Sequence, residues 1–171
     1  MRDTLTDAPA GVWPDEPSSG PALAGWLAVT VGAGTLVGAL TNGGADPWYA
    51  ALDKAPWNPP SWVFAPVWTT LYVLMALAAW FVWRRGGWRF QRVPLTLFLA
   101  QLTLNLAWSP LFFTAREPGL ALLDLAALWL MLLWTMRAFA RVLPLTAWLL
   151  APYLAWVTYA ATLNAWVAIR N

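Results

Sequence analysis

Long apolar runs alternate with short polar breaks along most of the 171-residue chain. A helix rises 1.5 Å per residue, so about 20 apolar residues are enough to cross a hydrocarbon core of about 30 Å. Five runs exceed that length, and they cover about 21–41, 61–83, 90–114, 119–141 and 144–169. The pattern predicts an all-α integral membrane protein, a bundle of five transmembrane helices.

The breaks between the runs differ in length and in charge. Those after the second, third and fourth runs are short, so consecutive helices are expected to be antiparallel neighbours, whereas the first connection, about 42–60, is long. Basic residues near helix ends favour the cytoplasmic side. Seven lie at the amino terminus and in the second and fourth breaks, against three, Lys54, Arg116 and Arg170, on the opposite side. We therefore expect the amino terminus inside, and the long connection and the carboxyl terminus outside.

The first 20 residues, MRDTLTDAPAGVWPDEPSSG, mix Pro, Gly, Ser and Asp without periodicity. They lack the basic start, apolar run and small-residue cleavage site of a signal peptide. We expect a mobile leader over 1–20, followed by a single transmembrane domain over 21–171.

The composition agrees with a membrane protein and narrows the chemistry. Sixty per cent of the residues are hydrophobic, only 11% are charged, and 15 are Trp. The chain has no Cys and no His, which removes disulfides, thiolate sites and the usual ligands of zinc, iron–sulfur clusters and haem. We expect no metal and no cofactor. The net charge of +2 and the scattered arginines give no indication of a nucleic-acid partner.

Polar side chains within the runs form stripes with aromatic residues. In the third run Gln101, Asn105, Trp108 and Phe112 fall at offsets of 4, 7 and 11, which places them on one helix face. Similar stripes are Phe64, Trp68, Tyr72 and Met75 in the second run, and Tyr153, Trp156, Ala160 and either Leu163 or Asn164 in the fifth. Such stripes can be helix-packing and interface residues. Three Trp-bearing stripes can also hold a flat aromatic ligand that a few polar groups orient.

Two other features of the runs have more than one interpretation. Asp124 lies five residues into the fourth run, at interfacial depth, so a hydrogen-bonded or ion-paired role is favoured over a proton relay. Gly34 and Gly38 form a GxxxG motif in the first run, and Ala28 and Gly32 have the same spacing. The motif is typical of close helix approach, within the subunit or across a dimer.

The long connection is rich in aromatic rings and prolines. Its stretch PWYAALDKAPWNPPSW covers residues 47–62. The prolines near its end remove amide donors and disfavour helical geometry, so we expect a bent, non-helical chain. It displays Trp48, Tyr49, Trp57 and Trp62. Such a loop either anchors at the membrane interface or covers a site.

Three segments, PWYAALDKAPWNPPSWVFAPVWTTLYVLM, QLTLNLAWSPLFF and PYLAWVTYAATLN, closely resemble the translocator protein family, whose bacterial members are called tryptophan-rich sensory proteins. The resemblance runs from about residue 24 to residue 164. It implies a five-helix bundle, usually a homodimer, with a porphyrin pocket beneath a lid formed by the first loop. The residues expected to bind ligand from the stripes and the resemblance are Trp48, Trp57, Trp68, Tyr72, Gln101, Asn105, Trp108, Phe112, Asp124, Tyr153, Trp156, Ala160 and Leu163.

The resemblance leaves three functions open. One is a receptor or sensor for porphyrins and similar flat hydrophobic ligands. The resemblance implies a bacterial cell membrane and leaves open whether it is the inner or the outer one. Another is an enzyme that degrades porphyrin in light, with Trp68 and Trp156 as its catalytic residues. A transporter of porphyrin or sterol is less favoured, because the chain has no internal repeat. The sterol motif of animal members is broken, since Ala165 and Trp166 stand where its Tyr is expected.

Overall fold

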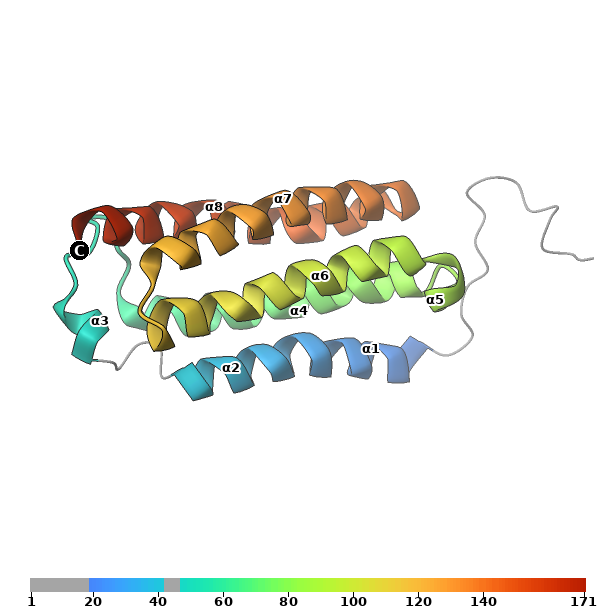
Figure 1. Cartoon of the computed structure of the whole chain (residues 1–171). Helices are drawn as coiled ribbons and strands as arrows, with labels where there is room; N and C mark the ends of the chain where they lie inside the picture. Colours follow the sequence, from blue (N-terminus) through green and yellow to red (C-terminus); the bar gives the residue numbers. More distant parts are fainter. Residues whose placement is uncertain (1–18, 42–46) are drawn as a thin grey trace, which may run out of the picture.

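The computed structural model describes residues 19–41 and 47–171, and these residues form helices joined by short connections (Figure 1). Most of the predicted leader lies outside the described residues, as do 42–46 of the long connection. The elements in chain order are α1 (Ser19–Leu27), π-helical η1 (Ala28–Gly32), α2 (Ala33–Thr41), α3 (Pro47–Ala51), 3₁₀-helical η2 (Ser61–Val63), α4 (Phe64–Trp83), α5 (Gly87–Phe90), α6 (Arg92–Ser109), π-helical η3 (Pro110–Thr114), α7 (Pro118–Val142) and α8 (Pro144–Arg170).

The elements combine into five long helices, close to the predicted runs, and the predicted all-α membrane fold is confirmed. Within the described residues, four helices are long and apolar enough to cross a membrane: Gly20–Thr41, Ser61–Trp83, Arg92–Thr114 and Pro118–Val142. The fifth, α8, has 27 residues. Its many Trp, Tyr, Thr and Pro residues lower its hydropathy without shortening it.

The long helices form a closed ring rather than a row. The first packs on α4 through α1 and η1, α4 packs on α8, α8 on α7, and α7 on α6, while α2 packs on α6 and closes the ring. Consecutive helices run antiparallel (Figure 1), but the prediction that they are all neighbours is wrong for α4 and α6, which are not adjacent in the ring, whereas the other consecutive pairs are. One end of the bundle carries α5, and the other carries α3 and the carboxyl terminus.

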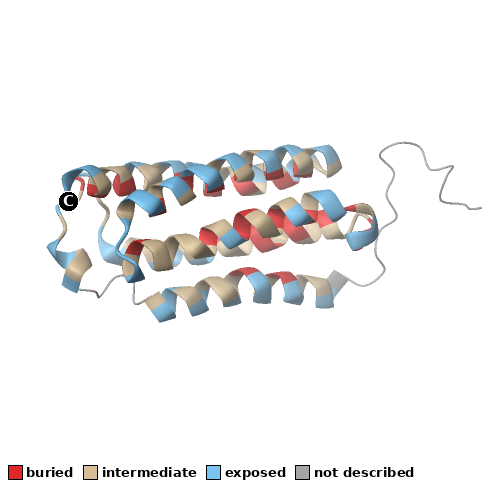
Figure 2. Ribbon diagram, viewed as in Figure 1, coloured by how far each residue is buried: buried red, intermediate tan, exposed pale blue. Residues whose placement is uncertain are grey.

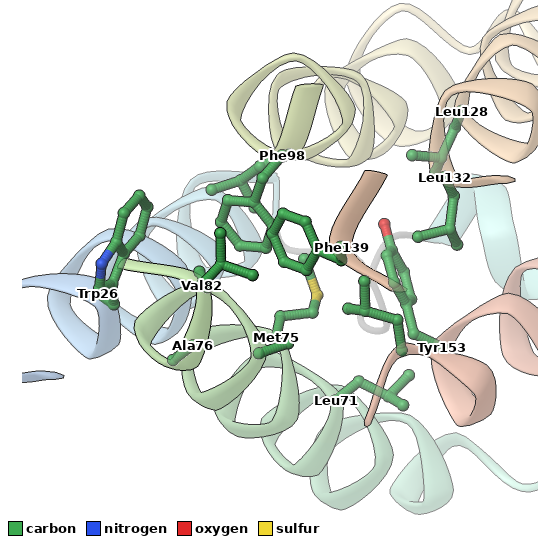
Figure 3. Close-up of a cluster of buried hydrophobic side chains, with 14 of the residues drawn as sticks. Trp26, Leu71, Met75, Ala76, Val82, Phe98, Leu128, Leu132, Phe139 and Tyr153 are labelled. Atoms are coloured by element: carbon green, nitrogen blue, oxygen red, sulfur yellow. The ribbon is translucent and has the colours of Figure 1, made fainter. Parts of the chain in front are cut away.

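The core fills the end of the bundle that carries α5. Its largest fully buried side chains include Met75, Phe98, Phe139 and Tyr153, which interdigitate between the helices (Figure 3). Buried residues are concentrated on the inner faces, and exposed residues face outward (Figure 2). The chain enters α5 through Gly86, whose φ of 103° is accessible to glycine and strained for other residues.

The first long helix is held to α4 at one point. The buried Thr30 hydroxyl in the π-helical turn contacts the carbonyl oxygens of Trp26 and Tyr72, each at 3.0 Å. One turn further on, Gly34 lies so close to the Tyr72 ring that any Cβ there would overlap with it. The GxxxG glycine Gly34 therefore serves close packing within the subunit.

The aromatic loop, by which we mean residues 47–60, is partly helical. The prediction that this stretch has no helix is wrong for Pro47–Ala51, which form α3. Pro47 is tolerated there because the first residue of a helix needs no amide donor. The remaining prolines follow α3, and the chain is non-helical through them, as expected.

Candidate functional site

A cavity of about 500 Å³ lies in the end of the bundle that carries the aromatic loop. All five long helices contribute to its wall, and Tyr49 and Asn58 of the loop close its outer end. Helices α6, α7 and α8 supply buried residues, whereas α2 supplies small ones such as Gly34 and Gly38. The larger hydrophobic core borders this space from the α5 end, and a smaller cluster around Phe112, Ala121 and Val167 packs beside it at the loop end.

Aromatic rings form much of the wall. Trp68 and Tyr72 of α4 stack with ring centroids 5.5 Å apart, and Trp108 and Phe112 stack at 5.1 Å. Trp156 of α8 adds a third indole. Stacked and edge-on aromatic rings favour a flat, apolar guest.

Two hydrogen-bonded pairs bring polar groups to this wall. The Tyr72 hydroxyl donates to Asn105 Oδ1 at 2.8 Å, joining α4 to α6. The Trp108 indole N–H donates to Asn164 Oδ1 at 2.9 Å, and Asn164 in turn donates to the carbonyl of Pro118 at 2.7 Å. These bonds satisfy groups that would be costly to leave unpaired within a membrane, and they fix the orientation of Tyr72 and Trp108.

The structure separates the thirteen residues predicted for the site into two groups. Eight line the cavity: Trp68, Tyr72, Asn105, Trp108, Phe112, Trp156, Ala160 and Leu163. The other five do not line it: Trp48, Trp57, Gln101, Asp124 and Tyr153.

Gln101 and Tyr153 lie below the cavity, one helical turn further from the loop than the lining residues Asn105 and Val157. Both side chains are fully buried. Neither amide atom of Gln101 has a hydrogen-bond partner, and the Tyr153 hydroxyl lies near Asn105 without good hydrogen-bond geometry. Asp124 is half-buried on α7 beside a lining residue, and one of its carboxylate oxygens is buried without a partner.

The two loop tryptophans pack against protein. Trp48 meets the edge of Phe112 at 5.7 Å, so it supports the cavity wall from behind. Trp57 lies on the outer face of α8, where its indole N–H donates to Thr162 at 3.3 Å and its ring meets Trp166 at 5.3 Å. Trp57 therefore fastens the loop instead of facing the cavity.

Several residues that line the cavity were not predicted. Asn164 was left as an alternative to Leu163, and both line the cavity because they are adjacent on α8. Tyr49 could have been found beside Trp48 in the aromatic stretch. Among the lining residues of α2, Gly34 and Gly38 belong to the GxxxG motif, which indicates close helix approach and not a ligand site.

Tyr49 brings a polar group to the outer end of the cavity. It lies in α3, outside the long helices. Burial raises the pKa of its hydroxyl, and a hydrogen bond with Asn58 opposes that shift, so the hydroxyl stays protonated at neutral pH. The Lys54 ammonium lies 4.8 Å from the ring centroid. No group of His, Cys, Asp or Glu able to hold a metal occurs in 19–41 or 47–171.

The fold and cavity define a multi-pass integral membrane protein with an aromatic-lined internal site. The TspO/MBR family profile matches residues 26–170, so the chain belongs to the TspO/MBR family. It is 48% identical over 119 residues to the translocator protein of Ovis aries, covering 68% of this chain and 70% of that relative. It is 41% identical over 133 residues to the tryptophan-rich sensory protein of Cereibacter sphaeroides, covering 78% and 81%.

Proposed function

We propose that this protein is a membrane receptor or sensor that binds a flat hydrophobic molecule of the porphyrin type in the cavity. The cavity is the observation that carries the proposal. Its volume of about 500 Å³ lies within the range of roughly 300–1,000 Å³ typical of small-molecule sites. Its wall combines three indoles with a few oriented polar groups, which is the arrangement that holds a flat aromatic guest.

The lining residues have distinct proposed roles. Trp68, Trp108 and Trp156 offer ring faces for stacking. Asn105 offers amide hydrogen bonds that set the orientation of the guest. Ala160 and Leu163 of α8 leave room for the ring edge and cover it with apolar surface.

The ligand is proposed to be metal-free tetrapyrrole rather than haem. Haem iron in proteins is commonly held by an axial His or Cys, and this chain has neither. Stacking and hydrogen bonding need no axial ligand. A relative is named a tryptophan-rich sensory protein, which supports a sensing role here.

A light-dependent porphyrin-degrading enzyme is the second candidate. The contacts of Trp156 favour it: its ring lies 5.9 Å from Phe64 and 5.4 Å from Tyr159. Trp68 similarly lies between Tyr72 and Tyr153, at 5.5 and 6.3 Å. These two tryptophans are the proposed redox-active rings of that reaction.

One experiment separates the two candidates. Purified protein is mixed with protoporphyrin, and absorbance is followed in darkness and under illumination, with Trp156→Phe as the control variant. Binding with a stable spectrum in light supports the receptor. Light-dependent decay that Trp156→Phe abolishes supports the enzyme, and no spectral change on mixing rejects both.

The cellular setting is also proposed. The resemblance to bacterial sensory proteins supports a bacterial cell membrane, and homodimerisation is proposed on the same ground. Because Gly34 packs on Tyr72 within the subunit, it is not available to a dimer interface.

A further inference from the structure

The cavity has an opening in its side. Five of its lining residues are exposed, namely Thr35, Gly38, Ser61, Ala65 and Thr69. All of them lie on α2 or on the first turns of the second long helix. The lining residues from α6, η3, α7 and α8 are buried or half-buried. The exposed part of the wall is therefore confined to the boundary between α2 and α4.

The packing of the first long helix explains this gap. Its first half, α1 and η1, packs on α4, and the contact of Gly34 with Tyr72 marks the end of that packing. Beyond Gly34 the helix packs on α6 and η3. The hydroxyls of Thr41 and Ser109 are 2.8 Å apart and fix α2 to that side. Since α2 packs on α6 and η3 instead of α4, the lining residues between α2 and α4 stay exposed.

The gap lies within the membrane-spanning segments. Its two edges belong to the candidate spans Gly20–Thr41 and Ser61–Trp83. From Ser61 to Thr69 it extends along two helical turns, about 11 Å. The side chains that line the gap are small and mildly polar. Leu36 and Leu40 of α2, by contrast, are exposed apolar side chains. An opening at this position faces the bilayer rather than the aqueous phase.

In contrast to the gap, the loop end of the cavity is closed, because hydrogen bonds hold the aromatic loop in place. The Tyr159 hydroxyl donates to the carbonyl of Trp57 at 2.7 Å, and Thr162 accepts from the Trp57 indole. The side-chain carbonyl of Asn171 accepts from the Asp53 amide at 3.0 Å. These three contacts connect Trp57 to α8 and Asp53 to Asn171, the residue that follows α8.

We infer that ligand reaches the cavity from the bilayer, through the gap between α2 and α4, while the aromatic loop stays fastened. This inference rests on the proposed function, and it defines the ligand class further. The ligand is a molecule that dissolves in the membrane and passes edge-first between two helices. A flat molecule suits a gap that is long in the direction of the helix axes and narrow across them. The small residues Gly38 and Ala65 leave the passage open.

A reversible block of the gap tests the route. Because the chain has no Cys, Ala65→Cys provides a single thiol at the gap. A benzyl methanethiosulfonate reagent adds a bulky group there, and a reductant removes it. Ala126→Cys, on the exposed face of α7 away from the cavity, is the matched control. Protoporphyrin uptake and release are measured in lipid nanodiscs by stopped-flow Trp fluorescence.

The expected result is that the label at position 65 slows both uptake and release, each by about tenfold or more, because a blocked passage hinders movement in both directions. Reductant restores both rates, and the label at position 126 has no effect. Unchanged rates at position 65 overturn the inference, and so does faster release with weaker affinity, which would mean that the label occupies the binding site. Failure of the proposed function is distinct, because unlabelled protein would then bind no protoporphyrin.

Tyr159→Phe provides the second arm, because it removes one fastening of the loop and leaves the gap intact. If ligand enters through the gap, Tyr159→Phe leaves the rates of protoporphyrin uptake and release at the parent values. If uptake and release instead quicken in this variant, the ligand passes beneath the loop and the inference is wrong.

Discussion

Gly34 determines where Tyr72 lies, because the ring occupies the space in which a side chain would stand. Gly34→Ala should displace Tyr72, weaken its 2.8 Å hydrogen bond to Asn105, and lower both thermal stability and porphyrin affinity. Overpacking of this kind typically costs about 1–3 kcal/mol. Gly25→Ala is the control, since nothing lies within 4 Å of a Cβ at Gly25. Unaltered stability and affinity in Gly34→Ala would mean that the ring adjusts freely.

Asn105 lines the cavity and joins α6 to α4 through Tyr72. Asn105→Leu keeps a similar volume and removes both the donor and the acceptor. We expect porphyrin affinity to fall severalfold to about tenfold, since an orienting hydrogen bond is worth roughly 0.5–1.5 kcal/mol. Fluorescence titration and thermal melting should be measured together. A lower melting temperature with unaltered affinity would show that Asn105 only connects helices.

Gln101 lies one helical turn from Asn105 on α6, toward the α5 end, and differs from Asn105 in that its amide is unpaired. Its amide is fully buried, and neither polar atom has a hydrogen-bond partner. A buried unpaired polar group costs about 1–3 kcal/mol, so Gln101→Leu should raise the thermal unfolding temperature. Affinity should stay close to the parent value because Gln101 does not line the cavity. Destabilisation by Gln101→Leu would instead reveal a hydrogen-bond partner.

At this scale the sequence predicts residue type better than residue role. Gln101 and Asn105 are amides on one helical stripe, and only the packing of α4 against α6 decides that Asn105 meets Tyr72. Similarly, Trp57 and Trp68 are equally aromatic, but one lies outside α8 and the other in the cavity wall. Helical periodicity gives the face of a residue and not the neighbour that the face meets.

The aromatic loop is an element whose attachment can be tested apart from ligand binding. Trp57→Ala removes the ring contact with Trp166 and the hydrogen bond to Thr162, so amide hydrogen exchange in the loop should quicken. Porphyrin release should keep its parent rate, because Trp57 does not line the cavity. This expectation replaces the lid role of Trp57 implied by family resemblance.

Trp62→Ala is the matched control for that loop. Trp62 is 74% exposed, so it suits the membrane interface rather than a packed position. Its removal should leave loop exchange unaltered in detergent. Equal exchange rates for Trp57→Ala and the parent protein would show that the contacts to α8 do not hold the loop.

Among the elements, the long helices were predictable and the gap was not. Hydropathy sets the extent of each helix because a bilayer demands an apolar run of fixed length. Helix α3 was not predicted because the helix-breaking effect of the later prolines was also assigned to Pro47. At the first position of a helix, however, Pro47 is compatible with helical geometry. The divergence of α2 from α4 follows from Gly34 and from the Thr41–Ser109 contact, which pairs residues far apart in sequence.

The whole molecule combines an end filled by large side chains with an end that contains the cavity. Large side chains such as Phe98 and Phe139 fill the end that carries α5, where their rings stack at 5.8 Å. The same five helices enclose the cavity at the loop end, where α2 contributes small residues and no buried one. We expect the filled end to hold the helix positions, so that the open side between α2 and α4 does not collapse. Binding in such a molecule is expected to order the loop end and leave the core unaltered.

The orientation of the molecule decides which half of the bilayer meets the gap, and it can be measured in the same Cys-free chain. The excess of basic residues at the α5 end predicts that this end lies inside. Ala50→Cys, exposed on α3, should therefore react with a membrane-impermeant maleimide in intact cells. Trp88→Cys, in the connection before α6, should react only after the membrane is opened, since Trp88 is 40% exposed at the opposite end. The reverse pattern would put the gap in the inner half of the bilayer, and labelling of both positions in intact cells would contradict a single orientation.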